Sequence, residues 1–83
     1  MMAINNIIPL HQLPIGGVGV VQNLLAQGLS RRRMMDLGLT PGARVEAIRV
    51  SPAGDPKAYK IRGAMLAFRK EESCKILVSY GGS

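Results

Sequence analysis

Side chains able to perform covalent chemistry are scarce in this chain. Its 83 residues include one histidine, His11, and one cysteine, Cys74. A serine or cysteine nucleophile needs a base beside it, and the single histidine lies in the amino-terminal segment. We interpret His11 as a solvated loop side chain and Cys74 as an inert thiol that opens an apolar strand face. The residue types therefore predict a protein that is not an enzyme.

The same scarcity bears on metals and cofactors. One cysteine and one histidine exclude a disulfide scaffold, a zinc finger and an iron–sulfur centre. The acidic residues form no pair at a helical metal-ligand spacing supported by a histidine, and the glycines at 16–19 lack the Lys-Ser or Lys-Thr ending of a phosphate-binding loop. We expect no cofactor and no tightly bound metal ion.

Arg31, Arg32 and Arg33 are the residues that purely structural roles explain least well. They fall in the first turn of a predicted helix, where the backbone N–H groups are already positive, so each cation costs about 0.3 to 1 kcal/mol. Successive helix residues point about 100° apart, so the three side chains cannot share one core-facing role. Two interpretations stay open: a solvated, solubilising face, or a contact for an anionic partner.

The segment from Ser30 to Gly38 carries the best helix pattern. Ser30 is a good N-cap and Gly38 a good left-handed terminator. With these ends, Leu29 would pack on Met34 as a hydrophobic staple, and Leu39 would meet Met34 in a Schellman ending. A helix of about two turns is not stable alone, so it must pack on a sheet.

Alternating apolar residues predict five short strands around this helix. Proline turns at 14–16 and 40–42 each precede a strand, and a hairpin turns near 63–64. Within 43–50 the apolar phase shifts by one residue, which indicates a β-bulge or a strand buried on both faces. The pattern predicts a mainly β fold: a small antiparallel barrel with one short helix after the first strand.

Composition and charge bound the class of protein. Apolar residues make up 47% and charged residues 19%, a globular composition, and 83 residues carry one small core. We predict a single domain over 8–80, with flexible ends at 1–7 and 81–83. No targeting segment or spanning helix is visible, so we expect a soluble cytoplasmic protein without membrane insertion. The formal net charge of +6 predicts an acidic partner.

A series of short motifs, unspecific one by one, is informative in its order and spacing. The series comprises Arg32-Arg33, Asp36 with Gly38, Thr40-Pro41-Gly42, Arg62-Gly63, and Leu66 with Arg69-Lys70-Glu71-Glu72. Over about residues 8 to 78 the chain thereby resembles the FeoA family of ferrous iron transport proteins. The resemblance implies an SH3-like barrel and a cytoplasmic accessory role beside FeoB, the membrane permease with a GTPase domain that imports Fe(II).

On this basis we predict a protein-interaction or regulatory module for an FeoB-like permease. Four arginines are predicted to make electrostatic contacts with it: Arg31, Arg32, Arg33 and Arg69. Leu24 and Leu25 occupy a segment that is usually glycine-rich and polar in members of that family. They are either apolar contacts beside the arginines or part of the core.

Nucleic-acid binding is the alternative function, because an SH3-like module with a charge of +6 would permit it. Single strands stack on exposed aromatic rings, however, and two of the three aromatic residues alternate inward in the predicted strands. A conventional SH3 domain for proline-rich peptides is disfavoured because the chain has no tryptophan and no aromatic run.

Overall fold

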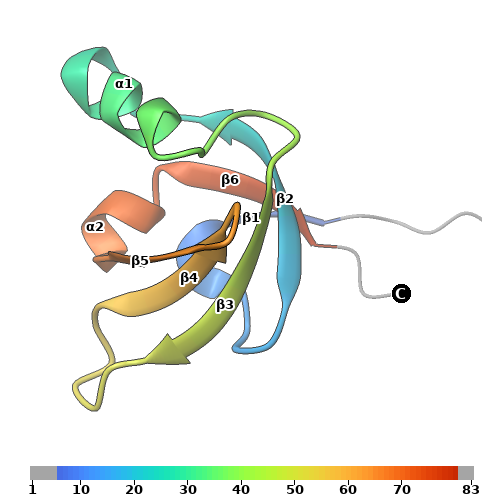
Figure 1. The fold of residues 1–83 in the computed structure, drawn as a ribbon, viewed down its shortest axis with the longest axis vertical. Helices are drawn as coiled ribbons and strands as arrows, with labels where there is room; N and C mark the ends of the chain where they lie inside the picture. The colour runs from blue at the N-terminus through green and yellow to red at the C-terminus, as the bar shows by residue number, and fades with distance from the viewer. Residues whose placement is uncertain (1–5, 81–83) are drawn as a thin grey trace, which may run out of the picture.

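The computed structural model describes residues 6–80, which form one curled antiparallel sheet with short helices at its margins (Figure 1). Six strands lie in the order β1-β6-β2-β3-β4-β5. The mainly β class with a short helix is therefore confirmed. Along the chain the elements are β1 (Asn6–Pro9), the 3-10 helix η1 (Leu10–Gln12), β2 (Val18–Leu24), α1 (Gly28–Asp36), β3 (Arg44–Val50), β4 (Lys57–Ile61), β5 (Ala64–Phe68), α2 (Lys70–Ser73) and β6 (Ile76–Tyr80).

The prediction of five strands missed β1. Asn6 and Ile7, which we expected in a flexible end, pair with Tyr80 and Ser79 of β6. Strand β1 lies at the edge of the sheet, where Pro9 is tolerated because an edge strand leaves every second N–H unpaired. The rest of the predicted flexible ends, 1–5 and 81–83, lies outside the described residues.

Both predicted proline turns are confirmed. The segments Pro14–Gly17 and Thr40–Ala43 are each closed by a hydrogen bond from the last N–H to the first C=O, of 2.8 and 2.9 Å. The third residues, Gly16 and Gly42, have φ of +88° and +93°, which glycine adopts without strain. Each turn leads into a long strand, β2 and β3 respectively.

The register of β3 and the β4–β5 turn also follow the sequence pattern. Ala47 and Arg49 pair with successive residues of β4, so Ile48 is the extra residue of the predicted β-bulge. Strands β4 and β5 are joined through Arg62 and Gly63, with φ of +51° and +81°. Two positive φ angles define the tight hairpin turn that suits the twist of a sheet. This turn lies one residue earlier than predicted.

The amino-terminal end of α1 differs from the prediction. The helix begins at Gly28, whose φ of +63° carries the chain out of β2, and no side chain caps it. Ser30 therefore lies inside the first turn and is not the N-cap. The predicted hydrophobic staple is wrong too, because Leu29 is 86% exposed while Met34 is buried.

The carboxyl-terminal end of α1 confirms the predicted Schellman ending. The N–H of Leu39 donates to the carbonyl of Met34, and the N–H of Gly38 donates to the carbonyl of Met35, both at 3.0 Å. Gly38 has φ of +103°, and both Leu39 and Met34 are buried in the core.

Gly38 also brings α1 against the β4–β5 hairpin. A Cβ at this position would lie 3.1 Å from Cδ of Arg62 and 3.3 Å from Cγ2 of Ile61, closer than ordinary contact. The guanidinium of Arg62 in turn donates to Oγ1 of Thr40 at 3.4 Å. Three of the short motifs seen in the sequence, around residues 38, 40–42 and 62, thus meet at one junction and position α1.

Inside the curled sheet lies a single apolar core. Tyr59 and Phe68 pack together, with ring centroids 6.1 Å apart, and both are buried. The other buried apolar side chains are small or aliphatic: Leu10, Leu13, Val21, Leu24, Ala26, Met34, Leu39, Ala43, Val45, Ala47, Ile61, Ile76 and Val78.

Candidate functional site

Helix α1 carries three of the predicted contact arginines and stands at one end of the sheet, at the top of Figure 1. Because the helix begins at Gly28, Arg31 is its fourth residue and Arg33 lies in its last turn. A cation in the last turn of a helix is favoured by the dipole. The predicted dipole penalty is therefore wrong for Arg33, and the helix dipole gives no argument for a binding role of the three arginines.

The three arginines differ in what they contact. Nη1 of Arg31 donates to the half-buried carbonyl of Leu24 at 3.3 Å, which ties α1 to the end of β2. Arg33 lies 3.9 Å from the carboxylate of Glu72, and its side chain is 73% exposed. Arg32 is exposed, and within residues 6–80 it makes no ion pair, not even with Asp36 one turn later. Arg32 and Arg33 are therefore the arginines available to a partner.

The two neighbouring leucines point in opposite directions. Leu24 is 4% exposed and belongs to the core, so the prediction that it contacts a partner is wrong. The reason is a register shift in β2 between Val21 and Asn23, which lets both Val21 and Leu24 face inward. Leu25 is 52% exposed and can contribute to a surface.

Leu29 is a surface residue that the sequence did not reveal, because it was expected to pack on Met34, and its side chain is 86% exposed. It precedes Arg32 by three positions and Arg33 by four, so all three lie on one outer face of α1. A predicted helix that began at Gly28, and not after Ser30, would have included Leu29 and revealed this face by its helical spacing. Together, the exposed side chains of Leu25, Leu29, Arg32 and Arg33 are called the α1 surface below.

Arg69 lies in a different neighbourhood. Its Nη1 is 3.8 Å from Oδ2 of Asp55, which lies in the loop between β3 and β4. Its backbone N–H, just before α2, donates a hydrogen bond to Oε1 of Glu72. Arg69 is exposed, but its ion pair directs it to the β3–β4 loop. The carboxylate of Glu72 thus lies between the Arg69 backbone and the guanidinium of Arg33, but the Arg69 side chain is directed away from the α1 surface.

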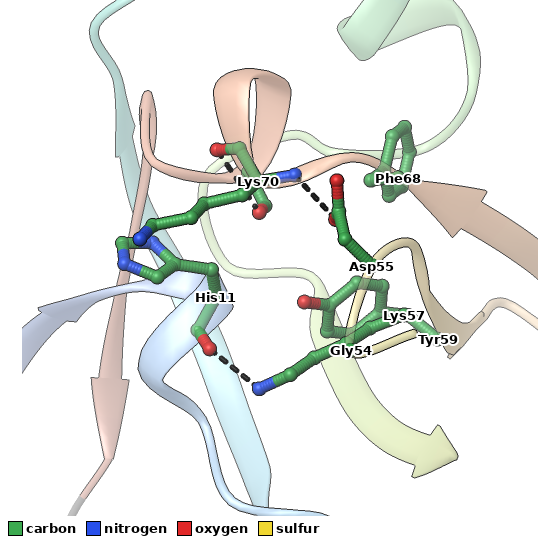
Figure 2. A pocket seen from close by; sticks show the side chains of 8 residues that line it. His11, Gly54, Asp55, Lys57, Tyr59, Phe68 and Lys70 are labelled. Atoms are coloured by element: carbon green, nitrogen blue, oxygen red, sulfur yellow. Dashed lines mark hydrogen bonds between the residues drawn. The ribbon is translucent and has the colours of Figure 1, made fainter. Parts of the chain in front are cut away.

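A cavity of about 210 Å³ opens beside this loop, between η1, β4 and α2 (Figure 2). His11, predicted to be a solvated loop residue, is a half-buried residue of η1 that lines the cavity. Nζ of Lys57 donates to the backbone carbonyl of His11 at 2.6 Å. Lys70 lies on the opposite wall, where its backbone N–H donates to Oδ1 of Asp55 at 2.8 Å. The remaining lining residues are Gly54, Tyr59, Phe68 and Ser73.

Two titratable groups of this cavity are perturbed. Burial, together with the positive charges of Lys70 and Lys57, lowers the pKa of His11 from its ordinary value of 6.5. Burial raises the pKa of Tyr59 above 10.0, an effect that the nearby Ser73 hydroxyl opposes. At neutral pH the imidazole is therefore uncharged and the phenol protonated.

Two findings concern the other function classes. The part of the chain described here contains no group of three His, Cys, Asp or Glu side chains placed to hold a metal ion, and none of its helices has the length and hydropathy of a membrane span. Tyr59 and Phe68 are buried as predicted, and Tyr80 is half-buried. These rings offer no exposed platform for stacking nucleotide bases.

Comparison with known proteins gives a consistent result. A family model described as "FeoA domain" matches residues 8–80. A protein of Porphyromonas gingivalis, named as a fusion of Fe(2+) transport protein A with the Fe(2+) transporter FeoB, is 28% identical over 69 residues. The match covers 83% of this chain and 8% of that protein, so the chain spans a small part of its relative.

Solved structures agree with the observed fold. The solution structure of a FeoA protein from Chlorobium tepidum is 36% identical, with a TM-score of 0.82 over 88% of this chain and 70% of that one. The crystal structure of Stenotrophomonas maltophilia FeoA complexed with zinc is 25% identical, with a TM-score of 0.74 over 92% of this chain and 89% of that one. The latter protein is described as a prokaryotic SH3 domain protein, in line with the expected SH3-like fold.

Proposed function

Because this chain belongs to the FeoA family, we propose that it is a non-enzymatic accessory protein of ferrous iron uptake that docks on the cytoplasmic side of an FeoB-type permease. Fe(2+) transport is the process in the name of the Porphyromonas gingivalis relative. The fusion in the Porphyromonas gingivalis relative supports docking, since one chain there carries both components. A module that works beside a permease needs a surface for it and no reactive site of its own.

The observation that carries the proposal is the exposure of Leu29 on a basic helix. Leu29 is 86% exposed, although burying such a side chain is worth about 1.5 to 3 kcal/mol. Arg32 and Arg33 flank it on the same face, and Leu25 lies exposed where β2 ends. An apolar residue within a cationic rim matches a partner that offers a hydrophobic pocket bordered by carboxylates.

The direct experiment measures binding to the soluble cytoplasmic domain of an FeoB-type permease by isothermal titration calorimetry. Leu29→Ala and Arg32→Glu are each expected to weaken binding by about tenfold or more, as central interface residues do. Neither side chain makes a contact that holds the fold together, so both variants should unfold at the same temperature as the parent protein.

Matched controls lie on the far strands of the sheet. Met65→Ala removes an apolar side chain that is 49% exposed, and Lys60→Glu makes the same charge change as Arg32→Glu at an exposed site of β4. Both should bind within about twofold of the parent protein. If these controls weaken binding as much as the α1 variants, only net charge and general apolarity matter, and the α1 surface is the wrong site.

A further inference from the structure

The cavity between η1, β4 and α2 holds two lysines without an acidic partner. Within residues 6–80 the ion pairs are Arg33 with Glu72 and Arg69 with Asp55, so neither Lys57 nor Lys70 is neutralised. The carboxylate of Asp55 faces the same cavity, but it is already engaged by Arg69 and by the backbone N–H of Lys70. The cavity wall is therefore cationic.

Lys57 is placed there by the strand that carries it. It shares the inward face of β4 with Tyr59 and Ile61, which are 0% and 1% exposed. A lysine in phase with core residues would normally be turned out to water. Here the ammonium group of Lys57 lies at the cavity, partly buried, and donates a hydrogen bond to the backbone carbonyl of His11 (Figure 2).

Two polar atoms at this cavity have no partner. The hydroxyl of Tyr59, on a side chain that is fully buried, and Nδ1 of His11 are both shielded from water, and neither has a partner at hydrogen-bond geometry. The Ser73 hydroxyl lies near the phenol, but it donates to the backbone carbonyls of Arg69 and Lys70. An unpaired buried polar group costs about 1 to 3 kcal/mol, so folded proteins rarely retain one without a use. The hydroxyl of Tyr59 points into the space between the two lysines in Figure 2.

We propose that this cavity is a binding site for a small, doubly charged oxyanion of the phosphate class. Such a ligand offers negative charge to the ammonium groups of Lys57 and Lys70 and acceptor oxygens to the hydroxyl of Tyr59. A cavity of about 210 Å³ admits an ion of this size. The site is separate from the α1 surface and does not depend on which partner that surface binds.

The test titrates the purified full-length protein with inorganic phosphate, and separately with acetate, at constant ionic strength, by calorimetry and by NMR of the His11 ring. Saturable phosphate binding and weaker acetate binding are expected. Lys70→Gln and Tyr59→Phe should each reduce phosphate affinity by about tenfold, because a hydrogen bond to a charged group is lost. Tyr59→Phe keeps the ring in the core and is expected to fold.

Lys60→Gln is the matched control, since it removes the same charge from the outer face of the same strand. It should change phosphate affinity by less than about twofold. The proposal is overturned if phosphate produces only a linear, unsaturable response, if acetate binds as tightly as phosphate, or if Lys60→Gln weakens binding as much as Lys70→Gln.

Discussion

Replacing Gly38 with alanine should destabilise the protein by about 2 to 4 kcal/mol, from two separable causes. A φ of +103° costs a residue with a Cβ about 1 to 2 kcal/mol. The added Cβ would also lie 3.1 Å from Cδ of Arg62 and 3.3 Å from Cγ2 of Ile61, whereas carbon atoms prefer about 3.5 to 4.0 Å. Ile61 is 1% exposed and cannot move aside, so crowding adds about 1 to 2 kcal/mol.

Urea and thermal unfolding followed by circular dichroism measure this loss. For a domain of this size, about 2 kcal/mol corresponds to a melting temperature lowered by roughly 8 °C or more. Gly42→Ala is the matched control, because Gly42 has φ of +93° but no atom within 4 Å of the Cβ position. It should lose only the backbone part, about 1 to 2 kcal/mol.

Equal losses for Gly38→Ala and Gly42→Ala would refute the reasoning, since close approach at the junction would then contribute nothing. A double-mutant cycle sharpens the test. If Arg62 is part of the crowding, Arg62→Ala should cost less in the Gly38→Ala background than in the parent protein.

Two further predictions concern titration and the α1 arginines. Because the pKa of His11 is lowered from 6.5 in the folded protein, the unfolded chain binds that proton more readily, so the free energy of unfolding should fall as the pH drops through 6.5 toward the lower folded value. In urea melts across this range His11→Gln should flatten the slope, and an unchanged slope would contradict the assignment. Arg33→Ala should alter the free energy of unfolding by less than about 0.5 kcal/mol, because its ion pair is exposed. Arg31→Ala should cost about 0.5 to 1.5 kcal/mol, since it loses the bond to the Leu24 carbonyl, and equal losses for the two variants would count against that bond.

Several features that depend on adjacent residues were predicted correctly from the sequence, although the equally local N-cap at Ser30 was not. The turn at 40–42 and the Schellman ending at Gly38 need only a proline or a glycine with a few neighbours, and both are present as predicted. The bulge at Ile48 was likewise indicated by the one-residue shift in the alternation of apolar residues within 43–50.

Features that depend on distant residues were missed. Strand β1 has four residues, too few for a clear alternation, and it exists because β6 pairs with it from the other end of the chain. The cavity between η1, β4 and α2 is lined by His11, Lys57 and Lys70, which come from three different elements. No local sequence pattern could predict that these residues lie together. One signal was nevertheless present, because Lys57 stands in phase with Tyr59 and Ile61.

The extra residue in β2, Gln22, determines which of two neighbouring leucines is buried. Leu24 is sealed in the interior and Leu25 faces water because of how many residues precede them in the strand, not because of their type. If β2 kept Gln22 but alternated strictly from Val21, Leu25 would face inward and Leu24 outward. Deleting Gln22 should instead remove the bulge and leave Leu24 in the core. The composition of the surface therefore depends partly on residue spacing. An alignment with a strand that lacks the extra residue needs a gap at Gln22 to match Leu24 with the inward position.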